Sequence, residues 1–66
     1  MKDIKFAENL KNLRAGKNMT QQQLADLLGV DRRTVSAWEK QICEPNYSTL
    51  AKICEIFDET FDNILT

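Results

Sequence analysis

The sequence contains no histidine, two cysteines, one proline and two glycines. Without histidine the chain lacks the most common general base and metal ligand. Its two cysteines do not form a Cys-x-x-Cys pair, which zinc sites commonly require. No apolar run approaches the roughly 20 residues of a membrane-spanning helix. We therefore expect no enzyme and no catalytic residues, no metal, cofactor or small-molecule ligand, and no association with a membrane.

The chain has 66 residues, enough for one domain with one small core. Such a core offsets the entropy cost of folding only narrowly, so we expect dense helix packing or a partner subunit. Cys54 lies in an apolar stripe and is predicted to be a core residue, whereas Cys43 lies in a predicted loop. Nothing in this pattern requires a disulfide, and we expect a cytoplasmic protein.

The net charge of −1 conceals an uneven distribution. Residues 1–18 carry five positive and two negative side chains, residues 19–40 carry three of each, and residues 41–66 carry one positive and five negative. A total near zero is unfavourable for binding nucleic acid, which requires a cationic face. The basic beginning and the acidic end show that the total does not describe the local field.

Apolar residues recur at helical spacing along the chain, and no segment alternates as a strand does. Phe6, Leu10 and Leu13 form one stripe and predict a first helix over residues 3–17. Asn18 follows at a position where helices often adopt the left-handed conformation.

The second helix has a complete start signal. Thr20 and Gln23 have the spacing of a capping box, and Met19 and Leu24 have the spacing of a hydrophobic staple. Gly29 predicts the end of this helix, because glycine adopts the left-handed conformation without steric cost.

Asp31 is predicted to cap a third helix that ends near Lys40, so only a short glycine turn separates the second and third helices. A loop over 41–45 precedes a fourth helix capped by Asn46 or Ser48. Its apolar stripe consists of Leu50, Ile53, Cys54 and Phe57. Thr60 is predicted to cap a short fifth helix.

Two helices joined by a tight turn suggest a helix-turn-helix, here over about 20–40, whose second helix enters the DNA major groove. One arc of the predicted third helix carries Arg32, Arg33, Ser36, Ala37 and Lys40. Arginine binds guanine through two hydrogen bonds, which favours this arc as a base-reading surface. The two arginines also oppose the helix dipole, which favours a functional role over a purely solvated one.

The segments Asn9–Arg14, Met19–Val30 and Thr34–Glu39, followed by Pro45 and Leu50, resemble the phage Cro and cI repressors and the bacterial XRE regulators. The resemblance covers about residues 6–65. It implies an all-α, lambda-repressor-like domain of five short helices over 1–66, which binds double-stranded DNA.

The resemblance also implies roles for individual residues. Arg32 and Arg33 match base-reading positions, and Ser36 matches a position that touches a base edge or a phosphate. Arg14 and Glu39 match a structural ion pair, and Trp38 matches a core position. The predicted base contacts are Arg32, Arg33, Ser36 and Ala37, and the predicted phosphate contacts are Lys17, Thr20, Gln21, Gln22 and Lys40.

Three departures from the family pattern qualify these roles. Ala37 replaces a long polar side chain and leaves only a thymine-methyl contact at that position. Glu44 places a negative charge in a loop that is commonly basic and contains glycine. Asn18 and Asp58 stand where the family tends to have glycine, and both residue types tolerate the left-handed conformation.

The acidic residues of the second half would be repelled by DNA, so we expect this half, about residues 46–66, to face away from the duplex. The resemblance implies that it builds a homodimer interface, with Phe61, Ile64 and Leu65 as candidates. These residues would otherwise complete the core of the monomer. A two-fold dimer would place its recognition helices about 34–36 Å apart on a palindromic site.

These observations predict a sequence-specific transcriptional regulator, most simply a repressor that occludes a promoter. The acidic balance, Ala37 and Glu44 support an alternative. In that alternative the same fold is a protein-binding module, such as an antitoxin or anti-repressor, with weak affinity for DNA. A steep loss of affinity with salt distinguishes the DNA reader from the module.

Overall fold

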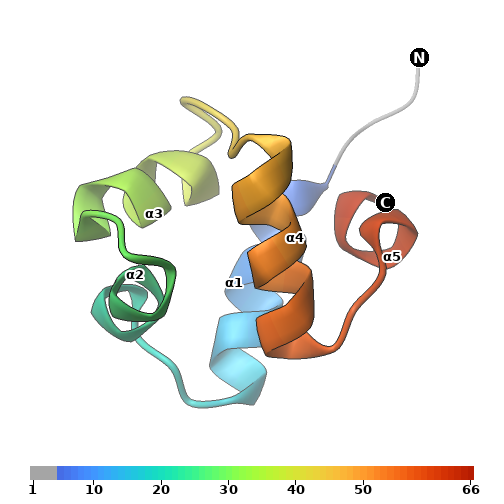
Figure 1. Cartoon of the computed structure of the whole chain (residues 1–66), viewed down its shortest axis with the longest axis horizontal. Helices are drawn as coiled ribbons and strands as arrows, with labels where there is room; N and C mark the ends of the chain where they lie inside the picture. Colours follow the sequence, from blue (N-terminus) through green and yellow to red (C-terminus); the bar gives the residue numbers. More distant parts are fainter. Residues whose placement is uncertain (1–4) are drawn as a thin grey trace.

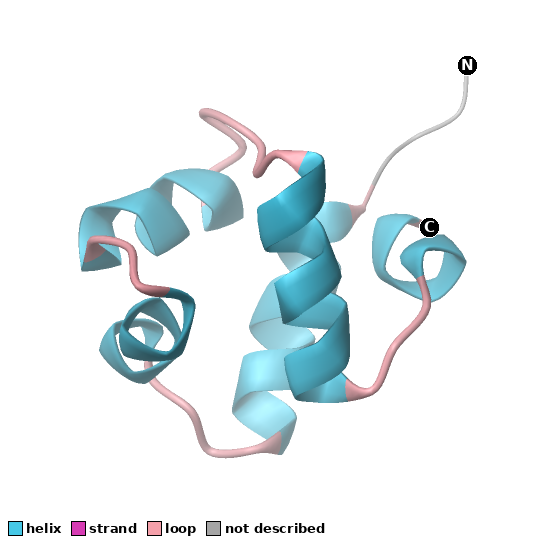
Figure 2. Ribbon diagram, viewed as in Figure 1, coloured by secondary structure: helices cyan, strands magenta, loops and turns pink. Residues whose placement is uncertain are grey.

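The computed structural model of the protein describes residues 5–66, which form five α-helices and no β-strand. The helices are α1 (Phe6–Gly16), α2 (Gln21–Leu28), α3 (Arg32–Glu39), α4 (Tyr47–Phe57) and α5 (Phe61–Leu65). Figure 1 shows α2 and α3 on one side of the molecule and α5 on the other, with α1 and α4 between them. Short loops join the helices (Figure 2). The predicted all-α fold class is confirmed.

The first helix is shorter than the predicted range of residues 3–17. Residues 3 and 4 of that prediction lie outside the described residues. Lys5 precedes α1 without a side-chain capping hydrogen bond, and the last helical residue is Gly16. Asn18 adopts a positive φ of 53°, as predicted.

Local side-chain caps fix the starts of α2 and α4. The Thr20 hydroxyl accepts a hydrogen bond from the Gln23 N–H at 3.0 Å, and the Gln23 side chain accepts one from the Thr20 N–H at 2.9 Å. The predicted capping box is therefore present. At α4, Asn46 accepts from the Thr49 N–H at 2.9 Å, which identifies Asn46 rather than Ser48 as the cap.

The turn between α2 and α3 has the predicted chemistry. Gly29 has a φ of 72°, and the Asp31 carboxylate accepts from the Arg33 N–H at 2.8 Å. At the other end of the molecule, Asp58 takes a positive φ of 54° after α4, and Thr60 caps α5. Thr60 caps this helix as the local sequence predicted, and the conformation of Asp58 is the one that the resemblance implied.

All five helices contribute to one hydrophobic core. It contains Phe6, Leu10, Leu24, Ala25, Leu28, Val35, Trp38, Leu50, Ile53, Cys54, Phe57 and Ile64. Burial raises the pKa of the Cys54 thiol, as suits a core position. Leu13, which the stripe of the first helix predicted to be buried, is half-buried and packs against this core.

Polar contacts join the two ends of the described chain. The Asn9 side-chain amide donates to the Ile64 carbonyl at 3.0 Å, and the Lys5 N–H donates to the Leu65 carbonyl at 3.1 Å. These contacts satisfy carbonyls at the end of α5, which has no further helical turn to do so. No described helix combines the length and apolar character needed to cross a bilayer.

Candidate nucleic-acid interface

The orientation of α3 is set by its buried side. Val35 is fully buried, and Trp38 packs edge-on against the Phe6 ring of α1, with ring centroids 6.5 Å apart and an interplanar angle of 67°. Trp38 is therefore a core residue, as predicted. Because this face is held against α1 and α2, the opposite arc of α3 points to solvent.

An ion pair between the half-buried Arg14 and the buried Glu39 joins α1 to the end of α3. Arg14 Nε donates to Glu39 Oε2 at 2.6 Å, and Arg14 Nη2 donates to Glu39 Oε1 at 2.8 Å. Arg14 Nη1 also donates to the Met19 carbonyl at 2.8 Å, just before α2. The hydrogen bond to Glu39 raises the pKa of Arg14, which remains charged throughout the physiological range. This one guanidinium thus connects α1 to the segments that begin α2 and end α3.

Gln21 completes this network, a contact that the sequence analysis missed. Its side-chain amide donates to Glu39 Oε1 at 2.9 Å. Gln21 is the first residue of α2, so the contact fixes the N-terminus of α2 relative to the end of α3. No local pattern signals a hydrogen bond between residues 18 positions apart.

The exposed arc of α3 carries the predicted base-contacting residues. Arg32 and Arg33 are exposed in the first turn, and Ser36 and Ala37 are half-buried along the same arc. Lys40 follows the helix and is exposed. This placement gives α3 a cationic surface with a small hydroxyl and a methyl group in its middle.

The two arginines differ in their partners. Arg33 forms an exposed ion pair with Asp31 at 3.4 Å. The Arg33 backbone N–H and then its side chain lower the pKa of the Asp31 carboxyl, and Asp31 in turn raises the pKa of Arg33. The negative charge of Asp31 at the start of α3 also offsets the unfavourable position of two arginines near the positive end of the dipole.

Two shallow hollows meet at Arg32. One is lined by Arg32, Arg33, Ser36, Ala37, Lys40 and Ile42 on the α3 side. The other lies at the N-terminus of α2, where Arg32 is joined by Thr20, Gln21 and Gln22 among others. The structure thus brings together the predicted base contacts and four of the five predicted phosphate contacts.

Some predicted phosphate contacts are already engaged within the protein. The Thr20 hydroxyl serves the capping box, and Gln22 Nε2 donates to Asp26 Oδ1 at 2.8 Å. Lys17 lies apart from the two hollows, in a depression that it shares with Asp26 and Leu27.

The residue missed on the α3 side is Ile42, which lines the hollow and is 73 % exposed. Its only signal in the sequence is an apolar side chain in a loop. Gln41, directly before it, has a φ of 62°.

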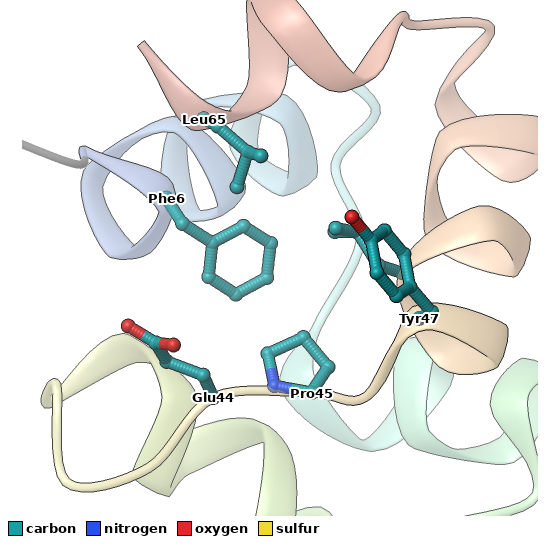
Figure 3. A pocket seen from close by; sticks show the side chains of 6 residues that line it. Phe6, Glu44, Pro45, Tyr47 and Leu65 are labelled. Atoms are coloured by element: carbon teal, nitrogen blue, oxygen red, sulfur yellow. The ribbon is translucent and has the colours of Figure 1, made fainter.

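A second exposed surface lies at the opposite side of the molecule, between the start of α4 and α5. The Tyr47 and Phe61 rings are stacked, with centroids 5.9 Å apart, and Tyr47 is 78 % exposed. They adjoin a pocket lined by Phe6, Glu44, Pro45, Tyr47, Leu50 and Leu65 (Figure 3). In Figure 3 the Phe6 ring lies between Leu65 and Pro45, with Tyr47 at the side of the pocket.

This surface corrects one predicted interface residue. Ile64 is 0 % exposed and belongs to the hydrophobic core, so its side chain is not offered to a partner. Phe61 is exposed and Leu65 is half-buried at the rim of the core. Helical spacing could not separate these three residues, because a short terminal helix has core-facing and solvent-facing apolar positions close together.

A helix-turn-helix family model matches residues 10–64 of this sequence. The chain belongs to the helix-turn-helix family of the XRE and Cro–cI type. The matched range begins in α1 and ends in α5, so it includes the whole α2–turn–α3 unit.

Similar proteins carry the names of transcriptional regulators. Over 63 residues the chain is 43 % identical to the HTH-type transcriptional activator BcrR of Enterococcus faecalis, covering 96 % of this chain and 31 % of BcrR. Over 60 residues it is 45 % identical to the HTH-type transcriptional regulator YqaE of Bacillus subtilis, covering 91 % of this chain and 52 % of YqaE. The chain therefore spans about a third to a half of these relatives.

The fold is also that of a solved regulator. A transcriptional regulator from Listeria innocua superposes with a TM-score of 0.93 and 28 % identity, covering 97 % of this chain and 60 % of that protein. Nearly the whole of this chain therefore shares its helix arrangement with a solved transcriptional regulator.

Proposed function

We propose that this helix-turn-helix protein is a sequence-specific, double-stranded-DNA-binding repressor that acts as a homodimer on a palindromic operator. The observation that carries the proposal is the shared position of Arg32, which borders both the α3 hollow and the hollow at the N-terminus of α2. One continuous surface thus offers base-reading side chains beside a helix N-terminus suited to phosphate.

On the α3 side, Arg32 and Arg33 would read base edges, and Ser36 and Ala37 would contact the bases beneath them. The Arg32 side chain makes no hydrogen bond or ion pair within the described residues, so it is available without rearrangement. Arg33 would exchange its exposed contact with Asp31 for a guanine. Exposed ion pairs of this kind are weak, so the exchange costs little.

On the α2 side, the N-terminus of the helix would hold a backbone phosphate. The N–H groups of Gln21 and Gln22 have no helical partner, since they lie in the first turn. Thr20, Gln21 and Gln22 surround this position, and Lys17 and Lys40 would neutralise neighbouring phosphates. The Gln21 bond to Glu39 uses one hydrogen of the side-chain amide and leaves the second to donate to a phosphate oxygen.

The opposite surface would pair two subunits. Tyr47, Phe61 and Leu65 form an apolar area that the described residues leave partly uncovered. The net negative charge of residues 41–66 supports this division, because a surface that pairs away from DNA has no need of cationic residues. Symmetric pairing would match an inverted repeat in the DNA.

A second candidate function is a protein-binding module such as an antitoxin or anti-repressor. The observation that favours it is the same pocket beside Tyr47, whose rim carries the acidic Glu44. In this case the pocket, rather than the α3 surface, would bind the main partner.

Selection of operators from random duplexes, followed by binding at several salt concentrations, tests the proposal. We expect one enriched palindromic sequence and a log–log salt slope of several units, since each phosphate contact contributes about −0.9. A flat slope without enrichment, together with a tightly bound protein partner, would support the second function. A reporter placed behind the selected operator then separates repression from activation, which is the role that BcrR is named for.

A further inference from the structure

Ile42 is an exposed apolar side chain within a cationic surface. It is 73 % exposed and lies in the hollow with Ala37, Ser36, Arg32, Arg33 and Lys40. It is absent from the hydrophobic core and from the residues packed against it. Nothing in the described monomer therefore compensates for exposing this side chain to water.

The backbone holds Ile42 at the end of α3. The Gln41 N–H donates to the Trp38 carbonyl at 3.1 Å, and the Ile42 N–H donates to the Ala37 carbonyl at 2.9 Å. With the φ of 62° at Gln41, these two bonds form a Schellman motif. In this motif the residue whose N–H donates the second of these bonds usually makes an apolar contact with the residue whose carbonyl accepts it. Here these residues are Ile42 and Ala37.

The surroundings restrict what can cover this apolar spot. Arg32, Arg33 and Lys40 lie in the same hollow, and they attract a polyanion. On a DNA duplex, the apolar group presented at base edges in the major groove is the 5-methyl group of thymine. Ala37 alone is too short to enclose a methyl group, but Ala37 together with Ile42 offers two sides of a contact.

We propose that Ile42, together with Ala37, forms a contact for one thymine methyl group and is a specificity-determining residue. This inference rests on the proposed DNA-binding function. It adds to the arginine contacts a preference for thymine that depends on no hydrogen bond. Its position after α3 places this thymine toward the C-terminal end of the recognition helix.

The test measures the affinity of the full chain for its selected operator, with each thymine replaced in turn by deoxyuridine. Loss of one buried methyl group lowers affinity about fourfold, and we expect this loss at one thymine and its symmetry mate. In Ile42→Ala the ratio of affinities for thymine and deoxyuridine at that position falls below about twofold, while Ile42→Val retains most of it. Leu27→Ala is the matched control, because Leu27 is an aliphatic residue of α2 with 60 % exposure outside this hollow.

Two results would overturn the proposal. In one, wild type is insensitive to deoxyuridine at every position. In the other, Ile42→Ala loses affinity equally for both duplexes, which indicates a contact to sugar or phosphate. Failure of the proposed function looks different, because then wild type enriches no operator in the initial selection. Circular dichroism of each variant identifies any loss of folding.

Discussion

The α2–α3 surface and the α4–α5 surface of this molecule leave different kinds of side chain exposed. On the first, arginines and a lysine surround a small apolar spot, and a partly buried network of Arg14, Glu39 and Gln21 holds the helices in place. On the second, the stacked rings of Tyr47 and Phe61 are exposed beside a pocket whose lining includes Glu44. The difference shows that a net charge of −1 describes neither surface.

The comparison also separates two ways of positioning helices. Among residues 5–66, α4 packs on the core through apolar side chains and makes no hydrogen bond to another helix, whereas α2 and α3 are additionally joined by charged hydrogen bonds. A bidentate ion pair fixes an angle as well as a distance. We infer that the polar network keeps the α2–α3 surface in one orientation, while the opposite surface needs only an apolar area.

The largest effect is expected where this polar network is broken. Glu39→Gln removes the negative charge and leaves the half-buried Arg14 without its ionic partner. We expect the free energy of unfolding to fall by about 3 kcal/mol, because breaking one side of a buried pair leaves an uncompensated charge. Urea unfolding measures this loss.

Glu55→Gln is the control for that experiment, because Glu55 is an exposed acid on α4. It should change the stability by less than about 0.5 kcal/mol. Equal stability of Glu39→Gln and wild type would contradict the claim that the polar network stabilises the α2–α3 side of the molecule.

A smaller effect, on binding rather than stability, is expected at Arg32. Arg32→Ala should weaken operator binding by roughly 30-fold, since a bidentate arginine contact contributes about 1–3 kcal/mol of discrimination. It should also relax the preference at one base position. Lys52→Ala removes a positive charge from the exposed side of α4. It should change the affinity and the base preference by less than about twofold. Titration of labelled duplexes measures both, and equal losses in the two variants would contradict the assignment of the DNA-binding surface.

The apolar side of the comparison is tested with Phe61→Ser. Loss of the ring removes its stacking on Tyr47, and we expect the self-association constant to fall by about tenfold. Sedimentation equilibrium of the full chain gives this constant. Leu27→Ser changes an exposed apolar residue on α2 and should not alter it. Dimers of unchanged strength in Phe61→Ser would exclude this surface as the interface.

The smallest effect concerns Asp31, whose carboxyl pKa is lowered mainly by the backbone N–H of Arg33. A lowered pKa in the folded state stabilises the protein above the ordinary value of about 3.8, and this contribution disappears as the pH falls through the lowered value. Asp31→Asn retains a cap but not the charge. We therefore expect its stability deficit to be present at pH 7 and absent near pH 2, as measured by urea unfolding across that range. A deficit that does not change with pH would show that the charge has no role.

Features that depend on neighbouring residues were predictable from the sequence. The capping box of Thr20 and Gln23 and the left-handed Gly29 have the predicted geometry. The start of α1 is less well predicted, because the stripe around Phe6 continues without a capping residue. Periodicity places a residue on the buried face but does not say where the helix begins.

The candidate site was predicted only in part for a related reason. The exposure of Arg32 and Arg33 follows from the stripe that buries Val35 and Trp38 on the other side of α3. The position of Ile42 depends on the positive φ of Gln41. The residue is not a glycine, so the sequence does not predict this conformation. An apolar residue in a loop has no periodic pattern, so the sequence contains no sign of its neighbours.

The sequence by itself determined the helices and the short turn between α2 and α3, because caps, glycine and apolar spacing act within a few residues. Only the tertiary structure decided that Gln21 bonds Glu39, that Tyr47 stacks on Phe61, and that Ile64 belongs to the core. Each of these depends on how packed helices bring distant positions together. The spacing of these residues along the chain does not predict the contacts, because each contact forms only once the core has formed.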